Sequence, residues 1–247
     1  MKMTSKSLVV LTAALEPKQV PFLVRADHAL RRRDYTDAMT HYASTLPADT
    51  FTLAVVENTG SDVDDLRTIA STFGHSLKTL CYTEEPAVQQ RGKGNAEAKM
   101  FDAVSNVFLQ EDSPYDRVIK ITGRLVVRNI DSVLRVPHPQ RFIAARMSFD
   151  RRQLDTRLLM TDVQTWKDFF SGQDSQVDEP AGVFLEHVAA LRTAEAIFAG
   201  ARWCQLRPKP IFAGYSGSTG YKYGSRRDRI LDGISGISGR LLQKHYI

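Results

Sequence analysis

The stretch Phe51-Thr52-Leu53-Ala54-Val55-Val56, followed by Glu57-Asn58-Thr59-Gly60, decides the fold class of this chain. A short apolar run of this kind, rich in β-branched residues, predicts a strand that is buried on both faces. Strands of that type are typical of parallel sheets covered by helices. The polar turn that follows predicts the point where the strand ends.

The same pattern recurs on both sides of this stretch. Apolar runs over 8–15, 77–82 and 117–121 predict three more buried strands, and the intervening sequence predicts helices over 27–42, 62–73 and 95–109. In the first of these helices, Arg31, Arg32 and Arg33 are expected on the polar side. The alternation predicts an α/β fold with a mainly parallel central sheet flanked by helices.

The second half of the chain is less regular. Strands are expected over 142–147 and 156–160, in a small mixed second sheet, and a helix is expected over 183–197. No internal repeat or low-complexity linker marks a domain boundary. We therefore expect one domain over 1–247, a length that can bury a full core without disulfides or a structural metal.

Composition excludes several classes of protein. The chain is 43% hydrophobic and 25% charged, as is usual for globular proteins. Its two cysteines, Cys81 and Cys204, have neither disulfide-framework nor zinc-site spacing, which favours a reducing compartment. No apolar run approaches the ~20 residues of a membrane span, and the run over 8–15 is interpreted as a strand rather than a secretion signal. A cytoplasmic protein is expected, and a peripheral contact with the inner face of a membrane stays open.

The net charge of +5 is concentrated in the tail, because residues 203–247 contain eight basic and two acidic residues. This distribution argues against a broad basic surface that binds nucleic acid, but it is compatible with a local binding site for an anion.

Polar residues and glycines follow the predicted strands at Thr12-Ala13, Glu57-Asn58, Arg91-Gly92-Lys93-Gly94 and Thr122-Gly123-Arg124. In open α/β sheets, ligands bind at the carboxyl ends of the strands. These residues therefore predict a site for a nucleotide or a similar anion. Neither GxGxxG nor a P-loop is present. Lys93 and the helix N-terminus after it suit a phosphate, with a solvated glycine turn as the alternative.

In order along the chain, these segments resemble glycosyltransferases of the GT-A fold. Glu57-Asn58-Thr59-Gly60-Ser61-Asp62 is similar to the second-strand motif of that family, which implies that Glu57 and Asn58 hold the nucleoside of a sugar nucleotide. Lys93-Gly94-Asn95-Ala96-Glu97-Ala98 resembles the glycine turn and helix under the diphosphate. Asp116-Arg117-Val118-Ile119-Lys120-Ile121-Thr122-Gly123-Arg124 falls where the family carries its Asp-x-Asp metal motif, and its Thr-Gly-Arg end is similar to variants among transferases of bacterial polysaccharide assembly.

The resemblance implies a nucleotide-binding half over 1–130, an acceptor half over 131–207 and a flexible basic lid over 208–247. Because Thr122-Gly123-Arg124 replaces Asp-x-Asp, no residue is assigned to a metal, although Mn²⁺ or Mg²⁺ stays a candidate cofactor. Arg124 can neutralise a diphosphate instead, since guanidinium pairs bidentately with phosphate oxygens; an ordinary surface arginine is the alternative.

Glycosyl transfer needs a carboxylate near the reacting carbon. The candidates are Asp155, Asp178, Glu179 and Glu186, with Glu186 preferred because it lies near the start of an apolar helix. A glutamate that only favours the helix dipole is the alternative. Asp155 is expected to contact the acceptor.

The tail holds Gly214-Tyr215-Ser216-Gly217 and, further on, the cations Lys222 and Arg226. We expect these cations to bind the diphosphate when the lid closes, with a loose basic tail as the alternative.

The expected function is a glycosyltransferase that moves a sugar from a nucleotide-sugar donor to a saccharide or lipid-linked glycan acceptor in surface polysaccharide synthesis. A nucleotidyltransferase, and a non-enzymatic module that binds nucleotide or nucleic acid through the tail, are the alternatives.

Overall fold

The computed structural model describes residues 6–17, 24–135, 139–217 and 219–224. Within them, the main sheet contains seven strands in the order β3-β2-β1-β4-β7-β6-β8. These strands are β1 (Lys6–Ala13), β2 (Phe51–Glu57), β3 (Lys78–Cys81), β4 (Tyr115–Thr122), β6 (Phe142–Met147), β7 (Leu154–Asp162) and β8 (Arg202–Cys204). The first four are mutually parallel, and β7 runs against its neighbours β4 and β6. The mainly parallel sheet predicted from the sequence is thereby confirmed.

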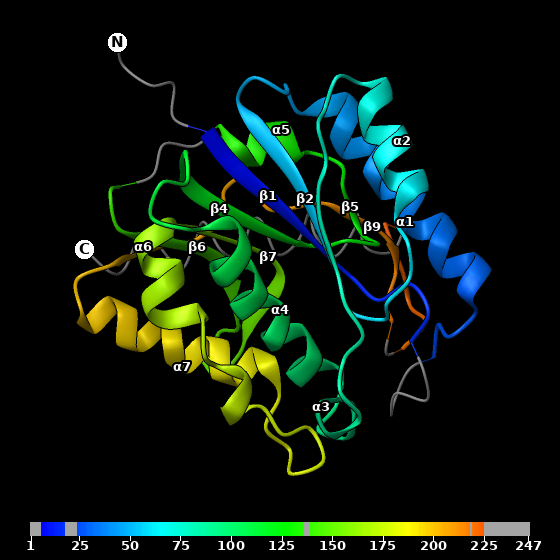
Figure 1. The fold of residues 1–247 in the computed structure, drawn as a ribbon. Helices are drawn as coiled ribbons and strands as arrows, with labels where there is room; N and C mark the ends of the chain where they lie inside the picture. Colours follow the sequence, from blue (N-terminus) through cyan, green and yellow to red (C-terminus); the bar gives the residue numbers. More distant parts are fainter. Residues whose placement is uncertain (1–5, 18–23, 136–138, 218, 225–247) are drawn as a thin grey trace.

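Helices cover both faces of this sheet (Figure 1). Apart from short turns over Trp166–Phe170 and Asp174–Gln176, they are α1 (His28–Thr45), α2 (Asp64–Thr72), α3 (Pro86–Gln90), α4 (Lys93–Phe108), α5 (Ile130–Leu134), α6 (Val163–Thr165) and α7 (Leu185–Phe198). Side chains alternate along β1: Val9 and Leu11 pack with α1, α2 and α5, whereas Leu8 and Val10 pack with α4 and α7. The continuous apolar run is therefore explained by burial on both faces.

The second half departs from the expectation in one respect. The strands over 142–147 and 156–160 were expected in a small mixed sheet, but they join the main sheet as β6 and β7. Most residues of β7 are buried, because Leu158 and Met160 pack into the core on one face of the sheet and Leu154 and Leu159 into the core on the other. The small sheet is antiparallel instead, and it consists of β5 (Val126–Val127), β9 (Phe212–Tyr215) and β10 (Lys222–Tyr223).

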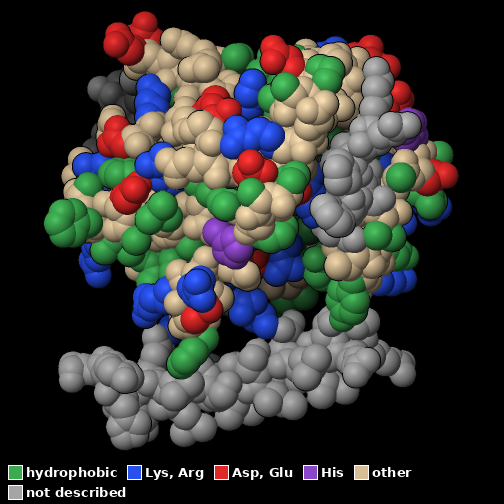
Figure 2. Space-filling model, turned by 90° about the horizontal axis from the view of Figure 1, so that it is seen from below, with side chains coloured by type: hydrophobic (Ala, Val, Ile, Leu, Met, Phe, Trp, Pro, Cys, Tyr) green, Lys and Arg blue, Asp and Glu red, His purple; other side chains and the backbone are tan. Residues whose placement is uncertain are grey.

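On the face seen in Figure 2, Lys and Arg side chains are interspersed with Asp and Glu. That face therefore carries no broad surface of one charge sign. Among the helices that the structure describes, none combines the length and the apolar character that crossing a membrane requires.

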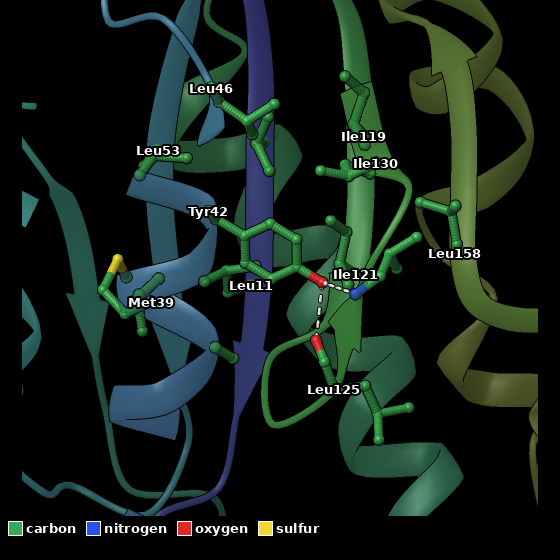
Figure 3. Packing of buried hydrophobic residues seen from close by; sticks show 14 of the residues in the cluster. Leu11, Met39, Tyr42, Leu46, Leu53, Ile119, Ile121, Leu125, Ile130 and Leu158 are labelled. Atoms are coloured by element: carbon green, nitrogen blue, oxygen red, sulfur yellow. Dashed lines mark hydrogen bonds between the residues drawn. The ribbon is translucent and has the colours of Figure 1, made fainter. Parts of the chain in front are cut away.

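Tyr42 connects α1 to the segment that follows β4 (Figure 3). Its ring is fully buried among apolar side chains such as Leu11, Ile121 and Leu125. The hydroxyl donates to the carbonyl of Leu125 at 2.7 Å and accepts from the amide of Val127 at 3.0 Å. Burial raises the pKa of this phenol, so it stays neutral. These two bonds fix the chain directly after Arg124, where the site begins.

Candidate functional site

A pocket lies at the edge of the main sheet where β1, β2 and β4 end and where α4 and α7 begin. The residues of its wall that the sequence predicted include Thr12, Ala13, Asn58, Gly92, Lys93, Thr122, Arg124 and Glu186. Other predicted residues that the structure describes lie outside that wall: Glu57, Arg91, Gly94, Gly123, Asp155, Asp178 and Lys222. Arg226 lies outside the described residues. Side chains that are far apart in the sequence thus lie close together, because the strands before them end at the same edge of the sheet.

At the end of β2, Glu57 lies beneath the pocket and is fully buried. One carboxylate oxygen accepts from the amide of Leu15 at 3.0 Å and from the hydroxyl of Thr59, and the other accepts from the amides of Thr59 at 2.9 Å and Ser61 at 3.1 Å. The carboxylate therefore organises the turn after its own strand. Asn58, by contrast, lines the pocket. Only 6% of it is exposed, and its buried Oδ1 has no hydrogen-bond partner among the described residues.

The glycine turn before α4 is closed by a carboxylate of the protein itself. The amide of Gly94 donates to Glu179 at 3.1 Å, and Gly92 adopts a φ of 101° against the same side chain, where a Cβ would collide with the carboxylate. Burial raises the pKa of Glu179, against the opposing charge of Lys93. Arg91 points away and donates to the carbonyl of Ser175 at 2.8 Å. In this turn Gly92 and Lys93 line the pocket.

The end of β4 approaches β1 closely. The amide of Gly123 donates to the carbonyl of Thr12 at 2.9 Å, and a Cβ at Gly123 would lie 2.8 Å from the same oxygen. Glycine is therefore the residue that fits between the two strand ends. The next residue, Arg124, lines the pocket, and its Nε lies 3.3 Å from the carbonyl of Tyr215.

A buried ion pair that was not predicted from the sequence lies directly under this strand end. Lys120 is fully buried, and its ammonium donates to Glu97, to the carbonyl of Thr156 at 2.7 Å and to the hydroxyl of Thr122 at 3.3 Å. Thr12 donates to the same Glu97 oxygen at 3.2 Å. Although burial acts in the other direction, the charge of Lys120 lowers the pKa of Glu97, so this carboxylate stays ionised. The available signal was a lysine inside the apolar run 118–121.

Arg31 and Arg157 also line the pocket without having been predicted for it. Arg31, expected on the polar side of its helix, is instead buried. Its guanidinium donates to the carbonyl of Ala14 at 2.8 Å and to that of Arg25 at 3.0 Å. Arg157 pairs with both carboxylate oxygens of Asp155, at 2.8 and 2.6 Å, and lies over the rings of Phe212 and Tyr223.

Among the candidate carboxylates, Glu186 is the one in the pocket wall. It occupies the first turn of α7, and the residue as a whole remains exposed. Desolvation on the pocket side raises its pKa, and the negative charge of Glu97 adds to the effect. Asp155 is engaged by Arg157, and Asp178 accepts from the amide of Ala181 at 3.2 Å in a turn away from the pocket.

The described part of the tail forms one wall of the pocket. Ser216 and Gly217 line it, and the carbonyl of Gly217 accepts from the amides of Val24 at 3.0 Å and Arg25 at 3.3 Å. Lys222, in β10, lies 5.6 Å above the ring of Tyr215 and does not line the pocket. The expected lid over 208–247 is thus described up to residue 224, and the rest of it lies beyond the described residues.

The residues at the end of β4 do not fit a divalent metal. Mg²⁺ and Mn²⁺ prefer carboxylate and other oxygen ligands, and Thr122-Gly123-Arg124 contributes no carboxylate and one cation. Nowhere in the described ranges do three or more His, Cys, Asp or Glu residues form a group that could hold a metal ion.

No family model matches the sequence, and no curated protein shows significant similarity to it. Among solved structures, the apo form of the glycosyltransferase GlyE from Streptococcus pneumoniae TIGR4 is similar with a TM-score of 0.52 and 12% identity, over 92% of this chain and 59% of that chain. This chain thus spans less than two thirds of GlyE.

Two other solved structures are less similar. The galactosyltransferase LgtC in complex with donor and acceptor sugar analogues has a TM-score of 0.46 and 11% identity, over 80% of this chain and 72% of that one. A cytidylyltransferase from Leptospira borgpetersenii has a TM-score of 0.44 and 10% identity, over 84% and 77%. Together with the observed strand order, the similarity to GlyE shows that the chain has the GT-A-like α/β fold expected from its sequence.

Proposed function

We propose that the chain is a glycosyltransferase that transfers a sugar from a nucleotide-sugar donor to a saccharide acceptor. The observation that carries this proposal is the composition of one pocket. It combines an unpartnered buried amide oxygen at Asn58, two cations at Lys93 and Arg124, and a carboxyl group of raised pKa at Glu186. These are the groups needed for a nucleoside, a diphosphate and an acceptor hydroxyl.

The donor half of the proposal rests on hydrogen bonding and charge. A buried acceptor without a partner costs stability unless a ligand supplies the donor, and an N–H of a nucleobase or an O–H of ribose suits Asn58 Oδ1. Arg124 and Lys93 then face the diphosphate. Positive groups placed where the leaving diphosphate gains charge stabilise the transition state. Glu57 supports this half from beneath, by holding the turn that carries Asn58.

The acceptor half of the proposal rests on Glu186. Its carboxylate takes the proton of an acceptor hydroxyl, the hydroxyl oxygen forms a bond to the anomeric carbon, and the bond from that carbon to the diphosphate breaks. The electron pair leaves with the nucleoside diphosphate. A raised pKa makes the carboxylate a better base near neutral pH. Asp155 and Asp178 remain secondary candidates, because each is engaged elsewhere.

We place the nucleotide-binding half of the domain at 1–130 and the acceptor half at 131–207, with the tail from 208 as the closing segment. Glu186 and Arg157 come from the second of these parts. An acceptor that belongs to a surface polysaccharide is favoured by the resemblance of 120–124 to transferases of that kind.

A nucleotidyltransferase is the second candidate, because a nucleotide site at the carboxyl ends of the strands of an α/β sheet suits that class as well. Such an enzyme would join a nucleoside triphosphate to a sugar phosphate and release pyrophosphate. A module that binds nucleic acid gains no support from the face in Figure 2, where acidic and basic side chains are interspersed.

The test is a thermal-shift panel of UDP-, GDP-, CMP- and dTDP-sugars and nucleoside triphosphates, each with and without Mn²⁺. A ligand that binds the folded state raises the Tm. We expect stabilisation by one class of nucleotide sugar, followed by release of its nucleoside diphosphate when a saccharide acceptor is added. Stabilisation by a nucleoside triphosphate, with release of pyrophosphate on addition of a sugar phosphate, would support the second candidate instead.

A further inference from the structure

The buried pair of Lys120 and Glu97 lies directly beneath the end of β4, next to Thr122-Gly123-Arg124, which stands in place of Asp-x-Asp. Lys120 comes two residues before the end of β4, and its ammonium makes three hydrogen bonds, to Glu97, Thr122 and the carbonyl of Thr156. With three donors on an ammonium group, Lys120 has no N–H left for a ligand. It is therefore a structural cation beneath the pocket and does not line it.

Glu97 belongs to both the pair and the pocket. Its side chain is 24% exposed and lines the pocket, while one of its oxygens is fixed by Lys120 and Thr12. Arg124 is close enough for its charge to act on this carboxylate as well. Two cations thus compete for Glu97, and the one that is fully buried holds it by a direct hydrogen bond.

The competition for Glu97 matters because the cations of the pocket must also neutralise a bound diphosphate. The diphosphate of a nucleotide sugar carries about two negative charges, because each of its two phosphorus atoms bears one ionised oxygen. If Glu97 were not neutralised from below, it would draw on Arg124 and repel the diphosphate. With Lys120 in place, Arg124 and Lys93 remain for the two phosphates, and neither makes an ion pair among the described residues.

We infer that the donor diphosphate is bound without a divalent metal, and that Lys120 is the positioning residue that permits this by holding Glu97 away from Arg124. The inference rests on the proposed function, because it concerns the donor of that reaction. It assigns Arg124 and Lys93 the neutralising role that a metal has in an Asp-x-Asp site. Glu97, paired and hydrogen-bonded, is not left as a lone ligand for a metal.

The experiment measures donor affinity by calorimetry, with EDTA and with Mn²⁺, for wild type, Lys120→Met and the double variant Lys120→Met/Glu97→Gln. Wild type is expected to bind the donor equally in both buffers. Lys120→Met leaves Glu97 without its buried partner, so its affinity in EDTA should fall by about tenfold or more. Mn²⁺ should then restore part of this loss, because the carboxylate is now open to a cation.

The double variant removes both charges and should recover metal-free binding, to within about twofold of wild type. Lys78→Met is the matched control, since Lys78 is an exposed lysine of the neighbouring strand β3, and it should match wild type in both buffers. If Lys120→Met does not fold, the double variant and the wild-type comparison still decide the question.

Loss of donor binding by wild type in EDTA would overturn the inference and leave the proposed function standing. So would equal weakening of Lys120→Met and the double variant with no response to Mn²⁺, because a purely structural role predicts that result. If no nucleotide sugar binds in either buffer, the proposed function itself fails.

Discussion

Replacing Glu57 by glutamine tests whether this carboxylate organises the turn at the end of β2. Its two oxygens accept four hydrogen bonds, three of them from backbone amides. Glutamine retains one acceptor oxygen, and its NH₂ group replaces the other. In place of one oxygen the NH₂ group would face the amides of Thr59 and Ser61; in place of the other it could donate to the Thr59 hydroxyl but would face the amide of Leu15. The variant therefore loses one or two hydrogen bonds to a charged group and gains an unfavourable contact between donors.

The size of the effect follows from these bonds. Each hydrogen bond to a charged group contributes about 1.5–3 kcal/mol, so the loss of one or two of them in Glu57→Gln should lower the free energy of unfolding by about 1.5–6 kcal/mol. For a domain of this size, about 2–4 °C in Tm corresponds to each kcal/mol, which gives a fall of about 3–24 °C. This is a large part of the ~5–15 kcal/mol that stabilises a typical domain.

The assay is thermal and urea unfolding followed by circular dichroism, with Glu111→Gln as the control. Glu111 is exposed in the turn after α4, so the same chemical change there should move the Tm by only about 1–2 °C. If Glu57→Gln unfolded at the wild-type temperature, the turn would not depend on this carboxylate. A direct contact of Glu57 with the nucleoside would then become the better explanation of the motif.

Three further predictions concern the pocket itself. Arg124→Ala should weaken donor binding by about 10–100-fold in a calorimetric titration, since one charge-assisted contact is lost. Arg135→Ala, at an exposed arginine, is the control. Equal affinities of the two variants would contradict a contact between Arg124 and the diphosphate. Glu186→Gln should reduce turnover by about 10²-fold or more with donor affinity retained. Because the pKa of Glu186 is raised, wild-type turnover should fall as the pH drops through a value above the usual glutamate range. If the variant lost turnover over the same pH range, another group would be responsible for that loss. The same raised pKa makes the ionised form unfavourable in the fold, so stability is lost as the pH rises through this range and the variant should unfold at a higher temperature than wild type above it. Gly123→Ala should cost about 1–3 kcal/mol in urea unfolding and weaken donor binding, because its Cβ would meet the Thr12 carbonyl at 2.8 Å; unchanged stability would show that the two strand ends separate freely.

The part of the fold that the sequence predicted is the part governed by local pattern. The runs that became β1, β2 and β4 are apolar on both sheet faces, so their type was readable, although β1 ends at Ala13 and not at Leu15 as expected. The sheet to which β6 and β7 belong could not be predicted in this way, because sheet membership depends on pairing between distant strands. Burial of Arg31 was missed for a similar reason, since its acceptors are backbone carbonyls of another segment.

The site shows the same division. Asn58, Lys93 and Arg124 were found by their position after strands, and the structure brings them into one pocket. The partner of Gly94 could not be found in this way, since Glu179 lies 85 residues further along the chain. Lys120 carried a readable signal, because a lysine inside a buried strand needs a partner. That this partner is Glu97 becomes clear only when α4 is placed against β4.

The antiparallel direction of β7 has a consequence for when the site can exist during synthesis. The start of β7 lies beside the end of β4, so the ammonium group of Lys120 can donate to the carbonyl of Thr156 in the neighbouring strand. Arg157, Glu186 and Ser216, which complete the pocket, emerge from the ribosome later still. A nascent chain that ends after β4 already contains Asn58, Lys93 and Arg124 but lacks the opposite wall. Donor binding should therefore appear only when the last part of the pocket has been made, and the ligand would act on the finished fold rather than guide its first half.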